Sequence, residues 1–117
     1  MTGAIVVQTT TATPEAAERL AEALVGEGLA ACVQIAPIRS RYVWKGAVQR
    51  EDEQLLLIKT REALFEAVHA RIRALHAYET PEIIATSVAA GDADYLTWLA
   101  AATDAQGAQR SGGSPGR

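Results

Sequence analysis

Two long β-type runs meet at the dipeptide Lys45-Gly46 and limit the possible folds more than any other feature of the sequence. The first, from Ile38 to Trp44, alternates its side chains between two faces, and the second, from Val48 to Thr60, begins polar and ends in the apolar LLLIKT. Because Lys45-Gly46 can reverse the chain, we predict a long hairpin with a polar far end and an apolar base. The edges of this hairpin are longer than those of ordinary short strands and can hold a partner chain.

The remaining elements alternate between strands and helices. We expect Leu29 to Ala36, LAACVQIA, to be a strand buried on both faces and interrupted by Pro37. The other predicted elements are a strand at Ala4 to Thr9, a helix from Thr13-Pro14-Glu15 to Gly26, a helix at Glu62 to His76, a strand at Glu82 to Val88, and a short helix started by Gly91-Asp92.

This order, βαββαβ followed by a C-terminal helix, predicts an α+β fold of the ferredoxin-like type. Its two crossovers place both main helices on one face of an antiparallel sheet. The opposite face then has no cover from its own chain. A closed homo-oligomer is the natural way to cover it.

Composition narrows the functional classes. The chain has 117 residues, 49% apolar and 21% charged, which suits one domain at residues 1–103 with a disordered tail at 104–117. A net charge of −3 without a basic run argues against nucleic acid as a partner. The N-terminus resembles no signal peptide and no segment is long enough to span a membrane. With one cysteine, Cys32, we expect a cytoplasmic protein.

The segment HAYETPEI, His76 to Ile83, is the densest group of chemically active side chains. His76 and Glu79 are a possible acid and base, and Tyr78 a possible assistant. A loop after a helix also needs polar groups for its free carbonyls, so a purely structural role carries equal weight. Pro81 forces the preceding residue to be extended, which fixes the direction of the loop.

Metal ligation is a second reading of these residues. Imidazole and thiolate suit copper or zinc, but Cys32 lies in an apolar run, where cysteine is more often an inert small hydrophobe. His69 and His76 are seven residues apart, about 10.5 Å along a helix, too far to chelate one ion. No CxxC, HExxH or calcium-loop motif is present, so a metal site would need distant residues or several subunits.

The hairpin offers two further candidates. Tyr42 and Trp44 lie on one strand face, where they can stack on a ligand or pack against another subunit. Lys59, at the end of LLLIK, can bind an anion or remain solvated.

Several of these motifs together resemble the CutA divalent-cation-tolerance family. They are AACVQ at Ala30 to Gln34, YVWKG at Tyr42 to Gly46, Glu53, IKT at Ile58 to Thr60, HAYETPEI, and DADYLTWL at Asp92 to Leu99. The resemblance covers about residues 4–102. The loop has Ala77 where family members often have proline or serine after the histidine.

The resemblance implies a ferredoxin-like subunit in a tight homotrimer, associated with copper and other divalent cations, with no firmly assigned catalysed reaction. It implies an intersubunit cleft formed by Cys32, Tyr42, Trp44, Lys59, His76, Tyr78, Glu79 and Pro81. Within this cleft we take His76, Cys32 and Glu79 as the candidate metal ligands.

The sequence therefore predicts a cytoplasmic homotrimer that binds a divalent metal ion, copper or a related one. The alternative is a sensor or scaffold that binds a small anionic metabolite through Lys59 and through stacking on Tyr42 or Trp44. An enzyme that uses His76 and Glu79 ranks last, because the sequence offers no evident nucleophile or oxyanion-stabilising element. We expect no enzymatic activity and no organic cofactor.

Overall fold

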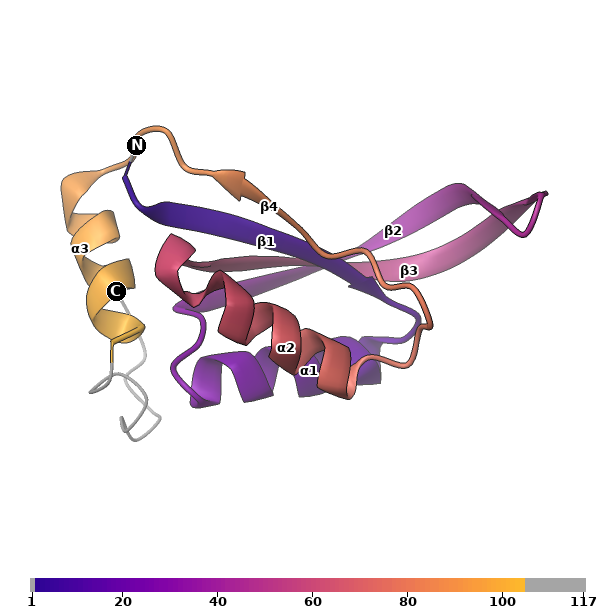
Figure 1. Ribbon diagram of the computed structural model, residues 1–117, viewed down its shortest axis with the longest axis horizontal. Helices are drawn as coiled ribbons and strands as arrows, with labels where there is room; N and C mark the ends of the chain where they lie inside the picture. Colours follow the sequence, from indigo (N-terminus) through magenta and orange to yellow (C-terminus); the bar gives the residue numbers. More distant parts are fainter. Residues whose placement is uncertain (1, 105–117) are drawn as a thin grey trace.

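Four strands form one antiparallel sheet in the order β2-β3-β1-β4 (Figure 1). The computed structural model describes residues 2–104. The elements follow the chain as β1 (Ala4–Thr11), α1 (Pro14–Gly26), β2 (Cys32–Trp44), β3 (Ala47–Arg61), the 3-10 turn η1 (Glu62–Leu64), α2 (Phe65–Leu75), β4 (Ile84–Ser87) and α3 (Ala93–Ala102). The predicted α+β class and order of elements are confirmed. The predicted tail lies, apart from Asp104, outside the described residues.

Both capped helix starts that the sequence predicts are present. The Thr13 side chain accepts a hydrogen bond from the Ala16 amide at 3.1 Å, and Pro14 occupies the first turn of α1. The Asp92 carboxylate accepts from the Tyr95 amide at 3.1 Å and starts α3. These side chains satisfy amide groups that a helix start leaves without partners.

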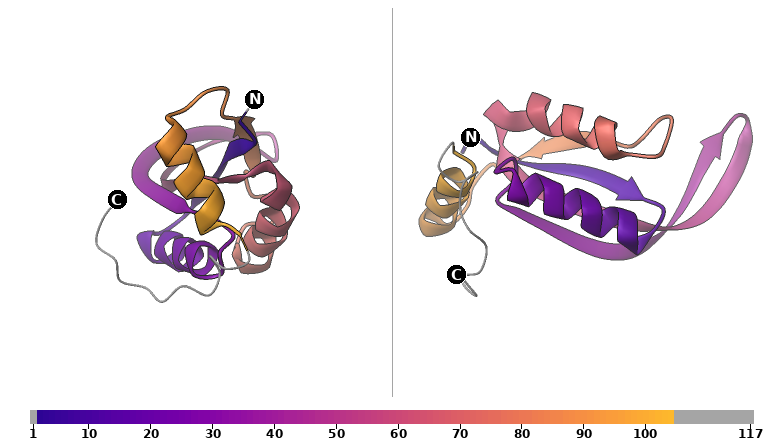
Figure 2. Two further views of the ribbon diagram at one scale, coloured as in Figure 1. Left: turned by 90° about the vertical axis from the view of Figure 1, so that its left-hand side faces the viewer. Right: turned by 90° about the horizontal axis from the view of Figure 1, so that it is seen from below.

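Helices α1 and α2 pack on one face of the sheet, and α3 lies across the end near the N-terminus (Figures 1 and 2). The hydrophobic core lies between the sheet and the first two helices, because alternate strand residues point toward the helices. Its buried members are Ile5, Val7, Ala17, Leu20, Leu24, Ala30, Leu56, Ile58, Val68 and Ile72.

The opposite sheet face carries the other half of each strand's side chains. Strand register places Val6, Cys32, Lys59 and Thr86 in one row across this face, and Gln8, Gln34, Leu57 and Ile84 in the next. No helix of the described chain covers it (Figure 1). Ile84 consequently remains 53% exposed. We call this surface the uncovered face.

The hairpin of β2 and β3 extends well beyond the helices (Figure 2). Its turn has positive φ at both central residues, 52° at Lys45 and 79° at Gly46. Two positive φ angles match the right-handed twist of the flanking strands, as in the mirror-image turns of tight hairpins. The turn therefore pairs Trp44 with Ala47 and fixes the register of the whole hairpin.

Two expectations about β2 were wrong. Pro37 does not interrupt it: Pro37 pairs in register with Gln54, because β2 is an edge strand, where proline is tolerated. The strand is also not buried on both faces, and Leu29 to Ala31 precede it. An edge position with one uncovered face leaves its residues half-buried or exposed within a single chain.

Smaller differences concern element ends. The predicted helix from Glu62 to His76 begins with η1, and His76 already has an extended backbone. The last strand is shorter than predicted, so that Pro81 and Glu82 lie in the loop before β4. This loop connects the end of α2 to the sheet and forms one wall of the site described below.

Arg61 fastens α3 to the sheet. Its Nε donates to Thr103 Oγ1 at 2.8 Å, and its Nη2 donates to the Thr103 carbonyl at 2.6 Å. Thr103 Oγ1 in turn donates to the Leu99 carbonyl at 2.9 Å. A cationic side chain thus binds the carbonyl end of the helix, where the helix dipole favours positive charge.

Replacement of Arg61 by alanine should release the end of α3. We expect Arg61→Ala to lower the free energy of unfolding by about 1–3 kcal/mol, because it removes two hydrogen bonds from a charged donor. Urea denaturation followed by tryptophan fluorescence measures this, since Trp98 lies on α3. Arg19→Ala, on the exposed side of α1, is the control, and an equal loss in both variants would contradict the role of Arg61.

Candidate functional site

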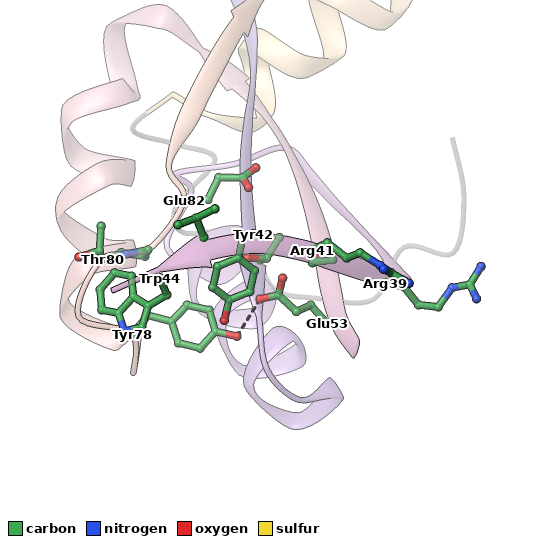
Figure 3. A pocket seen from close by; sticks show the side chains of 12 residues that line it. Arg39, Arg41, Tyr42, Trp44, Glu53, Tyr78, Thr80 and Glu82 are labelled. Carbon is green, nitrogen blue, oxygen red and sulfur yellow. Dashed lines mark hydrogen bonds between the residues drawn. The ribbon is translucent and has the colours of Figure 1, made fainter. Parts of the chain in front are cut away.

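A cavity of about 740 Å³ lies beside the half of the hairpin that ends at the Lys45-Gly46 turn, between β2 and the loop that follows α2 (Figure 3). Side chains from four segments surround it. They are Thr10 from β1, Arg39, Ser40, Arg41, Tyr42, Val43 and Trp44 from β2, Glu53 from β3, and Tyr78, Thr80, Pro81 and Glu82 from the loop. We call it the hairpin cavity.

A hydrogen bond between Tyr78 and Glu53 joins the loop to the hairpin. The Tyr78 hydroxyl donates to Glu53 Oε2 at 2.8 Å, and the Glu53 side chain is buried, with 6% exposure (Figure 3). Burial raises the pKa of Tyr78, and the hydrogen bond to Glu53 and its negative charge raise it further. The phenol therefore stays protonated as a donor to the carboxylate.

A second phenol binds a second carboxylate further along the hairpin. The Tyr42 hydroxyl donates to a carboxylate oxygen of Glu51, which lies diagonally across the two strands on the same face. This hydrogen bond raises the pKa of Tyr42 to about 12, and the negative charges of Glu51 and Glu53 act in the same direction. The two phenol–carboxylate pairs give this side of the hairpin a negative character.

His76 fixes the loop through both ring nitrogens. Its Nε2 lies 2.6 Å from the Thr10 carbonyl oxygen, and because that oxygen can only accept, Nε2 carries the hydrogen and donates. Nδ1 accepts a hydrogen bond from the Tyr78 amide at 3.1 Å. The two rings also touch, with centroids 4.7 Å apart. His76 thus positions Tyr78 rather than facing the cavity.

The structure brings together only part of the predicted site. Tyr42, Trp44, Tyr78 and Pro81 line the hairpin cavity. The other four do not, namely Cys32, Lys59, His76 and Glu79. The Glu79 side chain is exposed, and its backbone carbonyl accepts a long hydrogen bond of 3.4 Å from Arg73.

Cys32 and Lys59 pair with each other near the opposite end of the uncovered face. Their row crosses β1 at Val6, whereas His76 contacts Thr10, four residues further along the same strand. Four residues correspond to about 13 Å along a strand. One chain therefore does not bring the thiol of Cys32 to the imidazole of His76.

The three proposed ligands do not fit a metal site within one chain. No group of three or more His, Cys, Asp and Glu side chains suited to a metal ion occurs among residues 2–104. A firmly bound transition metal generally needs three or four such ligands. Ligation by His76 would also break one of its two hydrogen bonds.

The sequence analysis did not assign Glu53, Thr10 or Glu82 to the site. For Glu53 a signal was available, because a two-residue turn at Lys45-Gly46 pairs Glu53 with Ile38 and places it on the same face as Tyr42. Thr10 and Glu82 had no comparable signal. Whether Thr10 and Glu82 lie beside the cavity depends on the packing of β1 against β4 and on the path of the loop.

Comparison with known proteins identifies the family. Residues 5–102 match the family model described as CutA1 divalent ion tolerance protein. The chain belongs to the CutA1 family. It is 48% identical over 96 residues to "Protein CutA 1, chloroplastic" of Oryza sativa, a match that covers 81% of this chain and 54% of that protein. The chain thus spans about half the length of this plant relative.

Solved CutA structures agree with the fold. The divalent cation tolerance protein of Thermus thermophilus has a TM-score of 0.84 at 44% identity, covering 86% of this chain and 99% of that one. The structure of CutA from Archaeoglobus fulgidus, described as periplasmic, has a TM-score of 0.81 at 35% identity, covering 82% and 94%.

Cellular location differs among these CutA relatives, which include one described as chloroplastic and one as periplasmic. The cytoplasmic location of this chain therefore stays a prediction. Within residues 2–104, no helix has the length and apolar character that crossing a bilayer requires.

The role of His76 in this CutA1 family member can be tested by substitution. We expect His76→Leu to lower the free energy of unfolding by about 1–3 kcal/mol, because the Thr10 carbonyl and the Tyr78 amide both lose a partner. Chemical denaturation measures the change. His69→Leu, on the side of α2, is the matched control and should change stability much less; an equal loss would refute the role given to His76.

The raised pKa of Tyr42 predicts a titration. Absorbance near 295 nm should show a phenol that ionises at about pH 12, and Glu51→Gln should move this step toward the ordinary value of 10.0. Because the pKa is raised in the folded state, the associated stability is complete below pH 10 and is lost as the pH rises toward 12. An unchanged step in Glu51→Gln would exclude Glu51 as its main cause, and Glu15→Gln is the control.

Proposed function

We propose that this CutA1 family member is the subunit of a ferredoxin-like homotrimer that acts in the response to divalent cations. The observation that carries the proposal is the family match over residues 5–102, nearly all of the described chain. The family match does not by itself include trimer formation or the binding of a metal ion. Two features of the chain support these two parts of the proposal.

The first feature is the uncovered face. It combines aliphatic side chains such as Val6, Leu57 and Ile84 with a half-buried Cys32. Aliphatic side chains that their own chain leaves uncovered favour association. The sheet also ends in two edge strands, β2 and β4, which have hydrogen-bonding groups for a neighbouring chain. A closed trimer would cover both the face and the edges.

The second feature is the division of the expected cleft into two halves. Cys32 and Lys59 lie near one end of the uncovered face, and Tyr42, Trp44 and Tyr78 lie at the other. A cleft made of all these residues requires more than one chain. The long hairpin extends well beyond its own helices (Figure 2), which leaves its far half available to a neighbouring subunit.

We place the proposed copper or related divalent ion in this intersubunit cleft. Cys32 would supply a thiolate from one subunit and Glu79 an exposed carboxylate from another. His76 would join them only by releasing the Thr10 carbonyl or the Tyr78 amide. The ion is thus expected to bind to the assembled protein and not to a separate subunit.

The anionic-metabolite alternative has less support. It relied on Lys59 for charge and on Tyr42 or Trp44 for stacking, and one chain holds these groups at opposite ends of the hairpin. We also propose a role without catalysis, since His76, the expected acid or base, has both ring nitrogens engaged.

Assembly can be tested by charging the uncovered face. We expect the wild-type chain to sediment as a trimer and Leu57→Glu to dissociate it, because Leu57 lies at the centre of that face. Ala67→Glu, exposed on α2 and directed away from the sheet, should remain trimeric. Sedimentation velocity distinguishes these results, and a monomeric wild type would overturn the proposal.

Metal binding needs a separate titration. Calorimetry with Cu²⁺ should show binding of defined stoichiometry to the reduced trimer, weakened by at least about tenfold in Cys32→Ser. The dissociated Leu57→Glu variant should lose the binding as well. Binding that is unchanged in both variants would place the metal outside the intersubunit cleft.

A further inference from the structure

We propose that the hairpin cavity is a binding site for an ammonium group, held by the carboxylate of Glu53 and the aromatic rings of Tyr42, Trp44 and Tyr78. The proposal goes beyond a role in the response to divalent cations, because the occupant is an organic cation. Its aromatic residues also belong to the expected intersubunit cleft, but Glu53 is not among the proposed metal ligands.

Glu53 supplies the negative charge. Its side chain is only 6% exposed, and among the described residues only the Tyr78 hydroxyl donates a hydrogen bond to it, at Oε2. Oε1 is left without a donor from that part of the chain. Oε1 is not itself a fully buried atom, so it can accept a charge-assisted hydrogen bond from a cation that enters the cavity.

Three aromatic rings surround the same space. Figure 3 shows Tyr42, Trp44 and Tyr78 grouped beside Glu53 at one end of the cavity. Tyr42 and Trp44 are each 38% exposed, so their rings are open to a ligand within a single chain. Aromatic faces attract cations through the negative potential above the ring. The Lys45 ammonium already lies 5.8 Å from the centre of the Trp44 ring.

The cations that line the cavity do not neutralise Glu53. Arg39 and Arg41 extend toward the other end, away from Glu53 and the aromatic rings (Figure 3). Glu82, on the loop, adds a further negative charge to the lining, and its Oε2 accepts a hydrogen bond from the neutral Gln8 side chain at 2.8 Å. Of the two glutamates in the lining, Glu53 is the one beside the three aromatic rings (Figure 3).

The chemistry favours an ammonium group over a metal ion. A metal ion needs several ligating atoms in a fixed geometry, and the described residues form no such group here. An ammonium group needs only one strong acceptor and aromatic faces. Two sources could supply it, namely a small free amine or Lys59 of the partner subunit. The second source rests on the trimer proposed above, and either would present its ammonium group to the same carboxylate of Glu53.

The probe is n-butylammonium chloride, titrated into the full chain by calorimetry and followed by tryptophan fluorescence. Butan-1-ol, which has the same chain without charge, and sodium butyrate are the ligand controls. Glu53→Gln removes the charge but keeps an acceptor for Tyr78, so the loop should stay in place. Glu15→Gln, exposed on α1, is the matched control for loss of one negative charge.

We expect saturable binding of butylammonium, weakened by at least about tenfold in Glu53→Gln and unchanged in Glu15→Gln. Lys59→Met distinguishes the two sources. If only Lys59→Met binds the probe, and the double variant with Glu53→Gln does not, the site is confirmed and Lys59 of the partner subunit is its occupant. If the wild type binds, a free amine is the ligand.

Other results would overturn the proposal. One is the absence of binding by both the wild type and Lys59→Met. Another is equal binding by Glu53→Gln, or equal binding of butan-1-ol.

Discussion

The pairing of β2 with β3 is the constraint on which the rest of this structure depends. It runs without a break from Cys32 opposite Lys59 to Trp44 opposite Ala47, and the Lys45-Gly46 turn fixes its register. A shift of one residue would move every side chain of a strand to the other face. The same register that buries Leu56 and Ile58 under the helices therefore places Glu53 on the face of Tyr42.

The loop after α2 forms the candidate site together with the sheet. His76 binds the carbonyl of β1 and the amide of Tyr78, and Tyr78 then reaches across to Glu53 on the hairpin. Three segments that are far apart in the sequence are linked by three hydrogen bonds. His76 thus positions the loop, and the pair that faces the cavity is the phenol of Tyr78 with the carboxylate of Glu53.

This CutA1 family member has two proposed binding functions, metal binding at the uncovered face and ammonium binding in the hairpin cavity. The first would need several subunits, since Cys32 and the loop residues lie at opposite ends of one sheet face. The second needs only the residues of one hairpin and its loop. The hairpin contributes to both functions. It lines the cavity together with its own loop, and it extends beyond its own helices (Figure 2), where a neighbouring subunit would meet it.

The order of elements, the capped starts of α1 and α3, the Lys45-Gly46 turn and the family are all evident from the amino-acid sequence. These depend on local chemistry: a threonine or aspartate that accepts an amide, a dipeptide that tolerates positive φ, and the period of apolar residues. Half of the expected cleft, Tyr42, Trp44, Tyr78 and Pro81, could also be predicted. Three other results required the folded structure: Pro37 lies within an edge strand, both ring nitrogens of His76 are hydrogen-bonded, and Cys32 is remote from His76. Those outcomes depend on which strands are neighbours and where the loop crosses the sheet, and contacts between residues distant in the chain leave no periodic signal in the sequence.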